Sequence, residues 1–205
     1  MTKHIIAATF LALATTGAWA RSATEVFVNA PDTIVPLFTK TQRMDMADYF
    51  TYSLPTQVTN RLGGSSRIVE ANPAAIMVQV GPASQLQLAV LPLRGDTLVA
   101  VIETVLTPQA DSGVRFYRLS DWSPVAPENT IGMADFVVGS TSDLPADMPA
   151  MFFCQIHYDG INSHFVFTNT TRGYYTAGET PAGLDRLAGT VTATFDGRRW
   201  RKTKH

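Results

Sequence analysis

Four consecutive segments in the middle of the chain have the composition of β-strands, and their spacing constrains the fold most strongly. They are rich in Val, Ile, Leu and Phe and cover residues 74–80, 85–93, 98–107 and 114–119. Short turn sequences such as GPAS and RGDT separate them. β-favouring runs punctuated by turn residues at intervals of about ten residues predict an antiparallel meander. Residues 98–102 are apolar on both faces, so we expect this strand at the centre of the sheet.

The sequence upstream of these strands predicts helices. The sequence TKTQ from Thr39 to Gln42 fits a capping box, and a helix is expected at about residues 40–53. Residues 24–28 are expected as a short strand or an extended lead-in, and a helical turn is expected to start at Asn29. The apolar stripe of the longer helix consists of residues four apart, namely Met46, Phe50 and Leu54.

The second half of the chain is mainly β. Strand-like runs cover residues 151–158, 163–169 and 190–196, and the Asp-Gly pairs at 159–160 and 196–197 are hairpin signals. We therefore predict an α+β fold with N-terminal helices packed on a curved antiparallel β-meander, followed by a second, mainly β half. Residues 21–205 are expected to form a single domain, with possible halves at 21–127 and 128–205. The sequence MAD occurs at both 46–48 and 133–135, which leaves an internal duplication open.

The first twenty residues have the pattern of a signal peptide. A short polar start with Lys3 is followed by an apolar run at residues 5–18 and by the small-x-small sequence AWA at 18–20. The alternative is a buried N-terminal helix. About fourteen apolar residues are too few to span a bilayer, and no later run is longer. We expect an exported protein, periplasmic or secreted, with no transmembrane segment in the mature chain.

The charges are distributed unevenly along the mature chain. Without Lys3 it has 15 Lys and Arg against 17 Asp and Glu, and five of the positive charges lie in the last eight residues. A nucleic-acid-binding domain has a broader basic surface tied to a docking motif, so nucleic acid is not expected as a partner. The basic end suits either an anionic surface, such as lipid head groups or glycan, or a solvated chain end.

Two histidines flank the first Asp-Gly hairpin signal and are candidate metal ligands. If four residues form the loop, His157 and His164 face each other with Asp159 nearby, which suits a shared metal ion. If the Asp-Gly pair alone is the turn, the two histidines are separated, and they are then exposed imidazoles at strand ends. Cys154 is the only cysteine, so no intrachain disulfide is possible. We interpret it as a small buried residue rather than a nucleophile.

Paired carboxylates on the predicted helix are candidates for acid–base chemistry. Asp45 and Asp48 are three residues apart, on one face with Arg43 nearby, and all three are expected away from the apolar stripe. The alternative is a structural role near the helix N-terminus, where negative charge is favourable.

Aromatic residues near the C-terminus are candidates for a sugar-stacking surface. Tyr174, Tyr175 and Trp200 supply aromatic faces, although such residues also cover sheet edges or fill cores. The glycine-rich sequence GGSS at 63–66 lacks the lysine of a phosphate-binding loop, so nucleotide binding is not indicated. No cofactor is expected.

The sequence PDTIVPLFTKTQRMDMADYF at residues 31–50 is similar to the form P-D-x-x-x-P-x-L-T-x-x-x-R-x-D-M-x-D-F. This form opens an uncharacterised family of exported proteins found chiefly in Bacteroidales, domain of unknown function 3256, which the chain resembles. Tyr49 and Trp200 stand where Phe is common in the family. The resemblance implies an envelope setting in a Gram-negative bacterium and supplies no reaction. Further agreement comes from VTNRLGG at 58–64, FY at 116–117, DWSP at 121–124 and DGRRW at 196–200.

Together these patterns favour a non-enzymatic binding or scaffolding module of the bacterial envelope. Its partner would be an envelope protein or glycan, bound through a sheet face or an exposed edge. The alternative is a hydrolase acting on envelope glycans or peptides. A pocket that brings together Asp45, Asp48, His157 or His164 would favour the enzyme, whereas an exposed apolar patch would favour the binding module.

Overall fold

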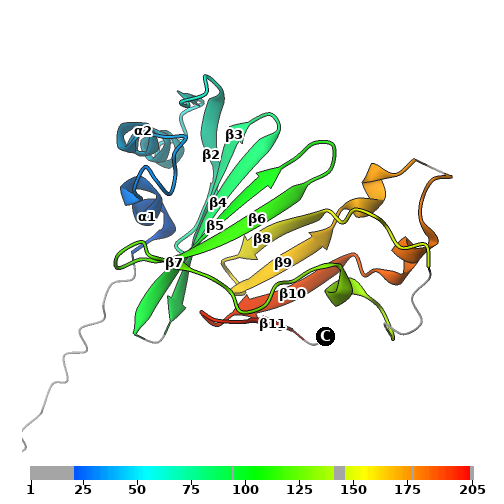
Figure 1. Cartoon of the computed structure of the whole chain (residues 1–205). Coiled ribbons are helices and arrows are strands. Elements are labelled where there is room, and N and C mark those ends of the chain that lie inside the picture. Colours follow the sequence, from blue (N-terminus) through cyan, green and yellow to red (C-terminus); the bar gives the residue numbers. More distant parts are fainter. Residues whose placement is uncertain (1–20, 94, 141–145, 177, 204–205) are drawn as a thin grey trace, which may run out of the picture.

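The computed structural model describes residues 21–93, 95–140, 146–176 and 178–203, and the expected signal peptide at 1–20 lies outside these ranges. Two helices, a seven-stranded sheet and a four-stranded sheet form three successive layers (Figure 1). The predicted α+β class is therefore confirmed. None of the helices in the described ranges combines the length and apolar character needed to cross a membrane.

The seven-stranded sheet is a continuous antiparallel meander in the order β1-β2-β3-β4-β5-β6-β7. Every strand of this sheet pairs with its neighbours in the chain. Its strands are β1 (Val58–Thr59), β2 (Ser65–Ala71), β3 (Ala75–Gly81), β4 (Ser84–Leu93), β5 (Asp96–Val105), β6 (Asp111–Arg118) and β7 (Pro124–Val125). The turn spacing predicted the four strands β3 to β6, and the structure adds β1, β2 and β7. The four-stranded sheet has the order β11-β10-β9-β8 and consists of β8 (Cys154–Asp159), β9 (His164–Asn169), β10 (Thr190–Phe195) and β11 (Trp200–Lys202).

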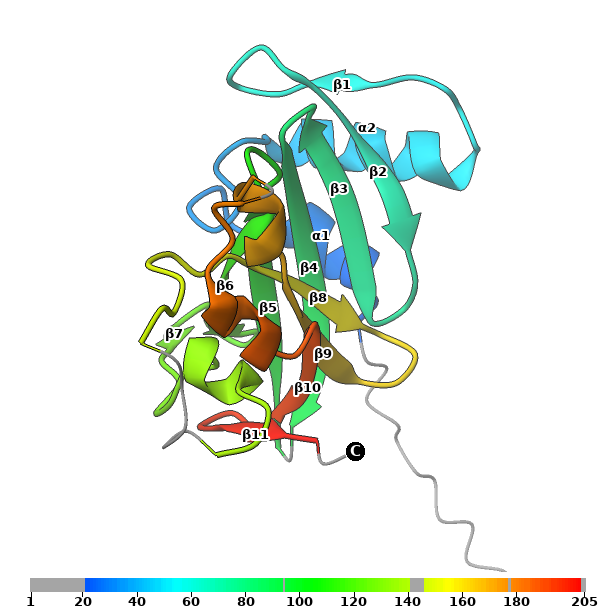
Figure 2. The ribbon, with the colours of Figure 1, turned by 90° about the vertical axis from the view of Figure 1, so that its right-hand side faces the viewer.

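Alternation along β4 and β5 divides the core into two halves. Leu88 and Val99 belong to a cluster on the helix side, and Ala100 and Ile102 belong to a cluster beneath the four-stranded sheet. Both faces of the central strands are therefore buried, in agreement with the apolar run at 98–102. Figure 2 shows the four-stranded sheet lying across the middle of the meander.

Helix α1 (Ala23–Asn29) corrects one expectation. Residues 24–28 are helical rather than extended, and a second capping box explains why. The Ser22 hydroxyl accepts a bond from the Glu25 amide, and the Glu25 carboxylate accepts one from the Ser22 amide. The sequence SATE at 22–25 carries this signal. The β-favouring residues Val26, Phe27 and Val28 that follow it favour a strand instead, which is why the sequence pattern alone predicts an extended segment.

Helix α2 (Lys40–Thr51) has the predicted capping box, with Gln42 N donating to Thr39 Oγ1 and Thr39 N donating to Gln42 Oε1. Its orientation differs from the prediction, because Phe50 and Leu54 are 38 % and 47 % exposed. Met46 is buried, and beside it Arg43 faces the core with only 1 % of its surface exposed. The repeated sequence MAD lies in α2 and in the short 3-10 helix η1 (Met133–Phe136) of the second half.

Polar side chains of the meander join the two sheets. Strand β8 is an edge of its sheet, and its alternate amides, those of Cys154, Ile156 and Tyr158, face away from β9 and bond side chains of the meander. Buried Gln87 accepts a bond from Tyr158 N at 2.8 Å and donates one to Tyr158 O at 3.0 Å. Ser112 Oγ accepts from Ile156 N at 3.0 Å and Asp111 Oδ1 from Cys154 N at 3.1 Å. The side chains thus take the place of a neighbouring strand for the three outward amides of β8 and for the Tyr158 carbonyl.

Replacement of Gln87 by Leu should lower the free energy of unfolding by about 2 kcal/mol, because it leaves the Tyr158 amide and carbonyl buried without partners. The matched control is Gln85→Leu, on the same strand and face, since among the described residues the side-chain amide of Gln85 bonds the Gln79 side chain and no backbone group. This control should change stability by less than about 0.5 kcal/mol. Urea unfolding of the two variants measures the difference. Equal losses would contradict the role given to Gln87.

Candidate functional site

An apolar groove opens where the loop between α1 and α2 meets the ends of β3, β4 and β5. Its volume is about 160 Å3. Residues 34–37 form one wall, and the opposite wall includes Val80, Leu86 and Val105. Val105 is 55 % exposed, so an apolar side chain lines the groove at the protein surface. The remaining lining residues are Ser84, Gln85, Glu103 and Thr104.

Arg43 holds the loop wall from the inside. Its guanidinium donates to the carbonyl oxygens of Phe38 and Ala30, each at 2.6 Å, and to that of Val28 at 3.3 Å. It also bonds Asp32 Oδ1 at 3.1 Å. The prediction that Arg43 lies off the buried stripe, as part of a candidate surface, is therefore wrong. One of these carbonyls is at the end of α1 and two are in the loop that follows it, and a single forked guanidinium bonds all three.

Arg61 holds the same loop from the outside. Its Nη2 bonds Asp32 Oδ2 at 2.5 Å, its Nη1 donates to Pro36 O at 3.0 Å, and its backbone amide donates to Leu37 O at 3.0 Å. Hydrogen bonds from Arg61 and then Arg43 lower the pKa of Asp32 below its ordinary value of 3.8. One carboxylate thus connects the two arginines, and the groove wall is fixed from both sides.

The candidate acid–base residues do not come together. Asp48 is exposed and Asp45 is half-buried, both on α2, whereas the two candidate histidines belong to β8 and β9 in the opposite outer layer (Figure 1). The seven-stranded sheet separates the two pairs. The convergence that would favour a hydrolase is therefore not found among these four residues.

The register of the β8–β9 hairpin fits neither arrangement expected for the histidines. Asp159 pairs with His164 and His157 pairs with Val166, so the loop consists of residues 160–163. The Asp159 carboxylate accepts bonds from Ile161 N and from the side chain and backbone of Asn162. The bonds from Asn162 lower its pKa. In the ranges that the structure describes, no group of three or more His, Cys, Asp or Glu residues is arranged to hold a metal ion.

Trp200 is a core residue rather than part of a surface for sugars. It is 6 % exposed, and its ring packs against four phenylalanines of the cluster between the sheets. Tyr174 is exposed and contacts Phe153 and Tyr175 at centroid distances of 5.2 and 5.4 Å. The expected surface of three aromatic residues therefore does not include Trp200. Its ring closes the core because β11 pairs with β10 directly beside Phe195.

Cys154 is half-buried at the start of β8. Burial, with a smaller contribution from the charge of Asp111, raises the pKa of its thiol to about 12. The nucleophilic form of cysteine is the thiolate, so this thiol is inert at neutral pH.

The sequence profile described as "Protein of unknown function (DUF3256)" matches residues 15–181, which include the whole loop wall of the groove. The chain belongs to this family. The DUF3256 match ends before the hairpin of β10 and β11.

A solved structure shares the DUF3256 fold seen here. It is described as "Structure of a domain of an uncharacterized protein from Porphyromonas gingivalis W83". The two are similar with a TM-score of 0.73 and 16 % sequence identity, over 91 % of this chain and 100 % of that one. At this identity the likeness shows the fold alone. No curated protein matches the chain.

The groove residues were not among the candidates from sequence. The loop at 31–38 was recognised only as part of a family motif, and residues 34–37 carry four apolar side chains in a segment without regular strand or helix. The available signal is an apolar run in a loop that contains Pro31 and Pro36. The position of Val105 opposite that loop depends on the strand register and has no local signature.

Replacement of Arg43 by Met should lower the free energy of unfolding by about 3 kcal/mol, because three carbonyls of α1 and the following loop lose this donor. Arg61→Met is the matched control, since Arg61 bonds the same carboxylate but is exposed. Its effect should stay below about 1 kcal/mol. Chemical denaturation measures both values. A larger loss for Arg61→Met would show that the outer arginine holds the loop.

Stability should depend on pH through Asp32. Its pKa is lowered in the folded state, so its contribution is present above the unfolded value and is lost as the pH falls through the folded value. Asp32→Asn should therefore lower the melting temperature at about pH 7, and this difference should shrink as the pH falls below the unfolded value of about 3.9. Thermal melts of wild type and variant across this pH range measure it. A difference that is independent of pH would contradict the ionic role of Asp32.

Proposed function

We propose that this protein is a non-catalytic binding module of the bacterial envelope, and that its groove receives one apolar side chain of a partner protein. The observation that supports this proposal is the groove itself. It is apolar, it reaches the surface at Val105, and two arginines hold its wall in place. A preformed apolar socket suits binding, because little conformational entropy is lost when a partner enters it.

The size of the groove favours a single side chain. Clefts that enclose small-molecule ligands usually have volumes of about 300–1,000 Å3. The groove has about 160 Å3, close to the roughly 150 Å3 of a cavity that holds one benzene molecule. A Leu or Phe side chain fits such a volume, whereas a length of polysaccharide or peptide substrate does not. Interfaces between proteins commonly depend on anchors of this kind.

The chemistry of the lining also supports binding over hydrolysis. Glu103 is the only ionisable residue among the lining residues, and its Oε2 is paired with Arg115 Nη2 at 2.8 Å. Both side chains are about half exposed. The arginine already neutralises this carboxylate, so it is poorly placed to exchange a proton with a substrate in the groove. The pair instead provides a polar rim beside an apolar centre, as protein interfaces have.

The envelope setting rests on the sequence. The signal-peptide pattern at residues 1–20 supports export, and the family resemblance supports a Gram-negative envelope. A protein partner exposed to the periplasm or to the outside is the kind of molecule that such a module would meet.

The test is site-specific photo-crosslinking of the full chain in the native organism. A benzophenone amino acid at Glu103, on the rim, should give a discrete adduct with one envelope protein. The same probe at Ile161, which is exposed in the β8–β9 loop on the other side of the molecule, should not give that adduct. Val105→Asp should reduce the adduct about tenfold, because it places a charge in the apolar groove.

The control for the added charge is Val138→Asp, at a similarly exposed valine outside the groove, which should leave the adduct unchanged. Equal adducts from both probe positions would contradict the proposal, as would an adduct that survives Val105→Asp. Release of soluble fragments from envelope glycan or peptide by the purified protein would establish the hydrolase instead.

A further inference from the structure

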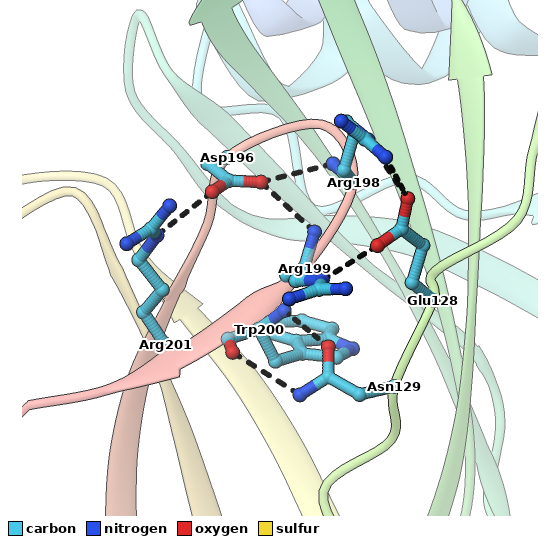
Figure 3. Close-up of polar contacts among 7 residues, drawn as sticks. All are labelled: Glu128, Asn129, Asp196, Arg198, Arg199, Trp200 and Arg201. Carbon is cyan, nitrogen blue, oxygen red and sulfur yellow. Dashed lines mark hydrogen bonds and ion pairs between the residues drawn. The ribbon is translucent and has the colours of Figure 1, made fainter.

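The turn between β10 and β11 presents three arginines on one small surface. Arg198, Arg199 and Arg201, here called the arginine hairpin, have exposed side chains at 78 %, 65 % and 71 %. They surround a polar hollow of about 260 Å3, which Asp196 also lines. Figure 3 shows the three guanidinium groups around the turn. The hairpin lies away from the apolar groove, and the two sites share no residue.

Neighbouring carboxylates hold these arginines mainly through the inner nitrogen of each guanidinium. Glu128 accepts from Arg199 Nε at 2.5 Å and from Arg198 Nε at 2.8 Å, and it also bonds Arg198 Nη2. Asp196 Oδ2 accepts from Arg201 Nε at 2.8 Å. The terminal nitrogens of Arg199 and Arg201 have no acceptor within the described part of the chain. The forks of Arg199 and Arg201 are therefore oriented while their outer donors stay open to a ligand.

Asp196 is engaged by the turn itself. Its Oδ1 accepts from the backbone amides of Arg198 at 3.0 Å and Arg199 at 2.8 Å. The backbone bond from Arg199, followed by the bond from Arg201, lowers its pKa to about 2. The Asp196 carboxylate is thus ionised at neutral pH and turned towards protein donors. Three guanidinium groups against two carboxylates leave the hairpin with a net positive charge.

The hairpin is also fixed to the body of the protein. Trp200 N donates to Asn129 Oδ1 at 2.8 Å, and Asn129 Nδ2 donates to Trp200 O at 3.2 Å (Figure 3). The Trp200 ring is buried in the core between the sheets. The arginines are consequently anchored by their neighbour in the chain, so their backbone needs little ordering when a ligand binds.

We infer that the arginine hairpin binds a phosphate monoester. Guanidinium forks match the oxygens of phosphate, and hydrogen bonds between ions of opposite charge are the strong ones. A phosphate monoester carries up to two negative charges and three outer oxygens, which suits three arginines around one hollow. A carboxylate offers only two oxygens in one plane, and it leaves part of the donor set unused.

The test is calorimetric titration of the mature full chain with inorganic phosphate, alongside a flotation assay with phosphatidylcholine vesicles containing phosphatidic acid. Each of Arg199→Gln and Arg201→Gln should weaken binding about tenfold, since each removes charged hydrogen bonds to the ligand. Arg172→Gln is the control, because Arg172 is an exposed arginine paired with Asp185 outside the hairpin. Thermal melts confirm that the variants are folded.

The outcomes separate the possible sources of the phosphate. Binding to inorganic phosphate without vesicles supports a soluble ester, binding only to phosphatidic acid vesicles supports a lipid head group, and binding to both supports the bare phosphate group as the determinant. Absence of binding in both assays would overturn the inference. Equal weakening by Arg172→Gln would overturn it as well, since it would show non-specific attraction. Because the hairpin and the groove are separate, the result does not depend on the proposed partner protein.

Discussion

The buried guanidinium of Arg43 is the interaction on which the helical layer depends. A charge inside an apolar cluster is unfavourable unless its donors are satisfied, and here three carbonyls and one carboxylate satisfy them. These acceptors come from the end of α1 and from the loop that follows it, whereas the donor comes from α2. One side chain therefore fixes both helices and the intervening loop relative to each other. The shape of the groove is a direct result.

The middle layer, the seven-stranded sheet, depends on being covered on both of its faces. Strands β4 and β5 are buried on both faces, so the meander needs cover on both sides. Helices cover one face and the second sheet covers the other (Figure 1). Because β8 crosses the strands of the meander at an angle, its backbone cannot form a β-ladder with any of them. Gln87 and Ser112 supply the missing hydrogen bonds from within the meander, and this makes the two sheets a single unit.

Local patterns in the sequence predicted the parts of the fold that local interactions determine. The meander follows from turn spacing, and the start of α2 follows from the pair Thr39 and Gln42. Burial of Arg43 was not predictable in this way, since its acceptors lie up to fifteen residues away. The local sequence around Trp200 does not show whether its ring is buried in the core or exposed. The register of the β8–β9 hairpin is fixed by the burial of Tyr158 and Phe165 rather than by the Asp-Gly pair.

The occupied amides on the edge of β8 affect how copies of the protein associate at high concentration. An edge strand with open amides is a template on which another chain extends the sheet. On β8 the amides of Cys154, Ile156 and Tyr158 are already occupied, so strand exchange has no starting point there. Along β2, where β1 covers only Ser65 and Ser66, a bulge between Ile68 and Glu70 interrupts the register that a fibril would need. Both edges are thereby protected against self-templated growth in a crowded compartment.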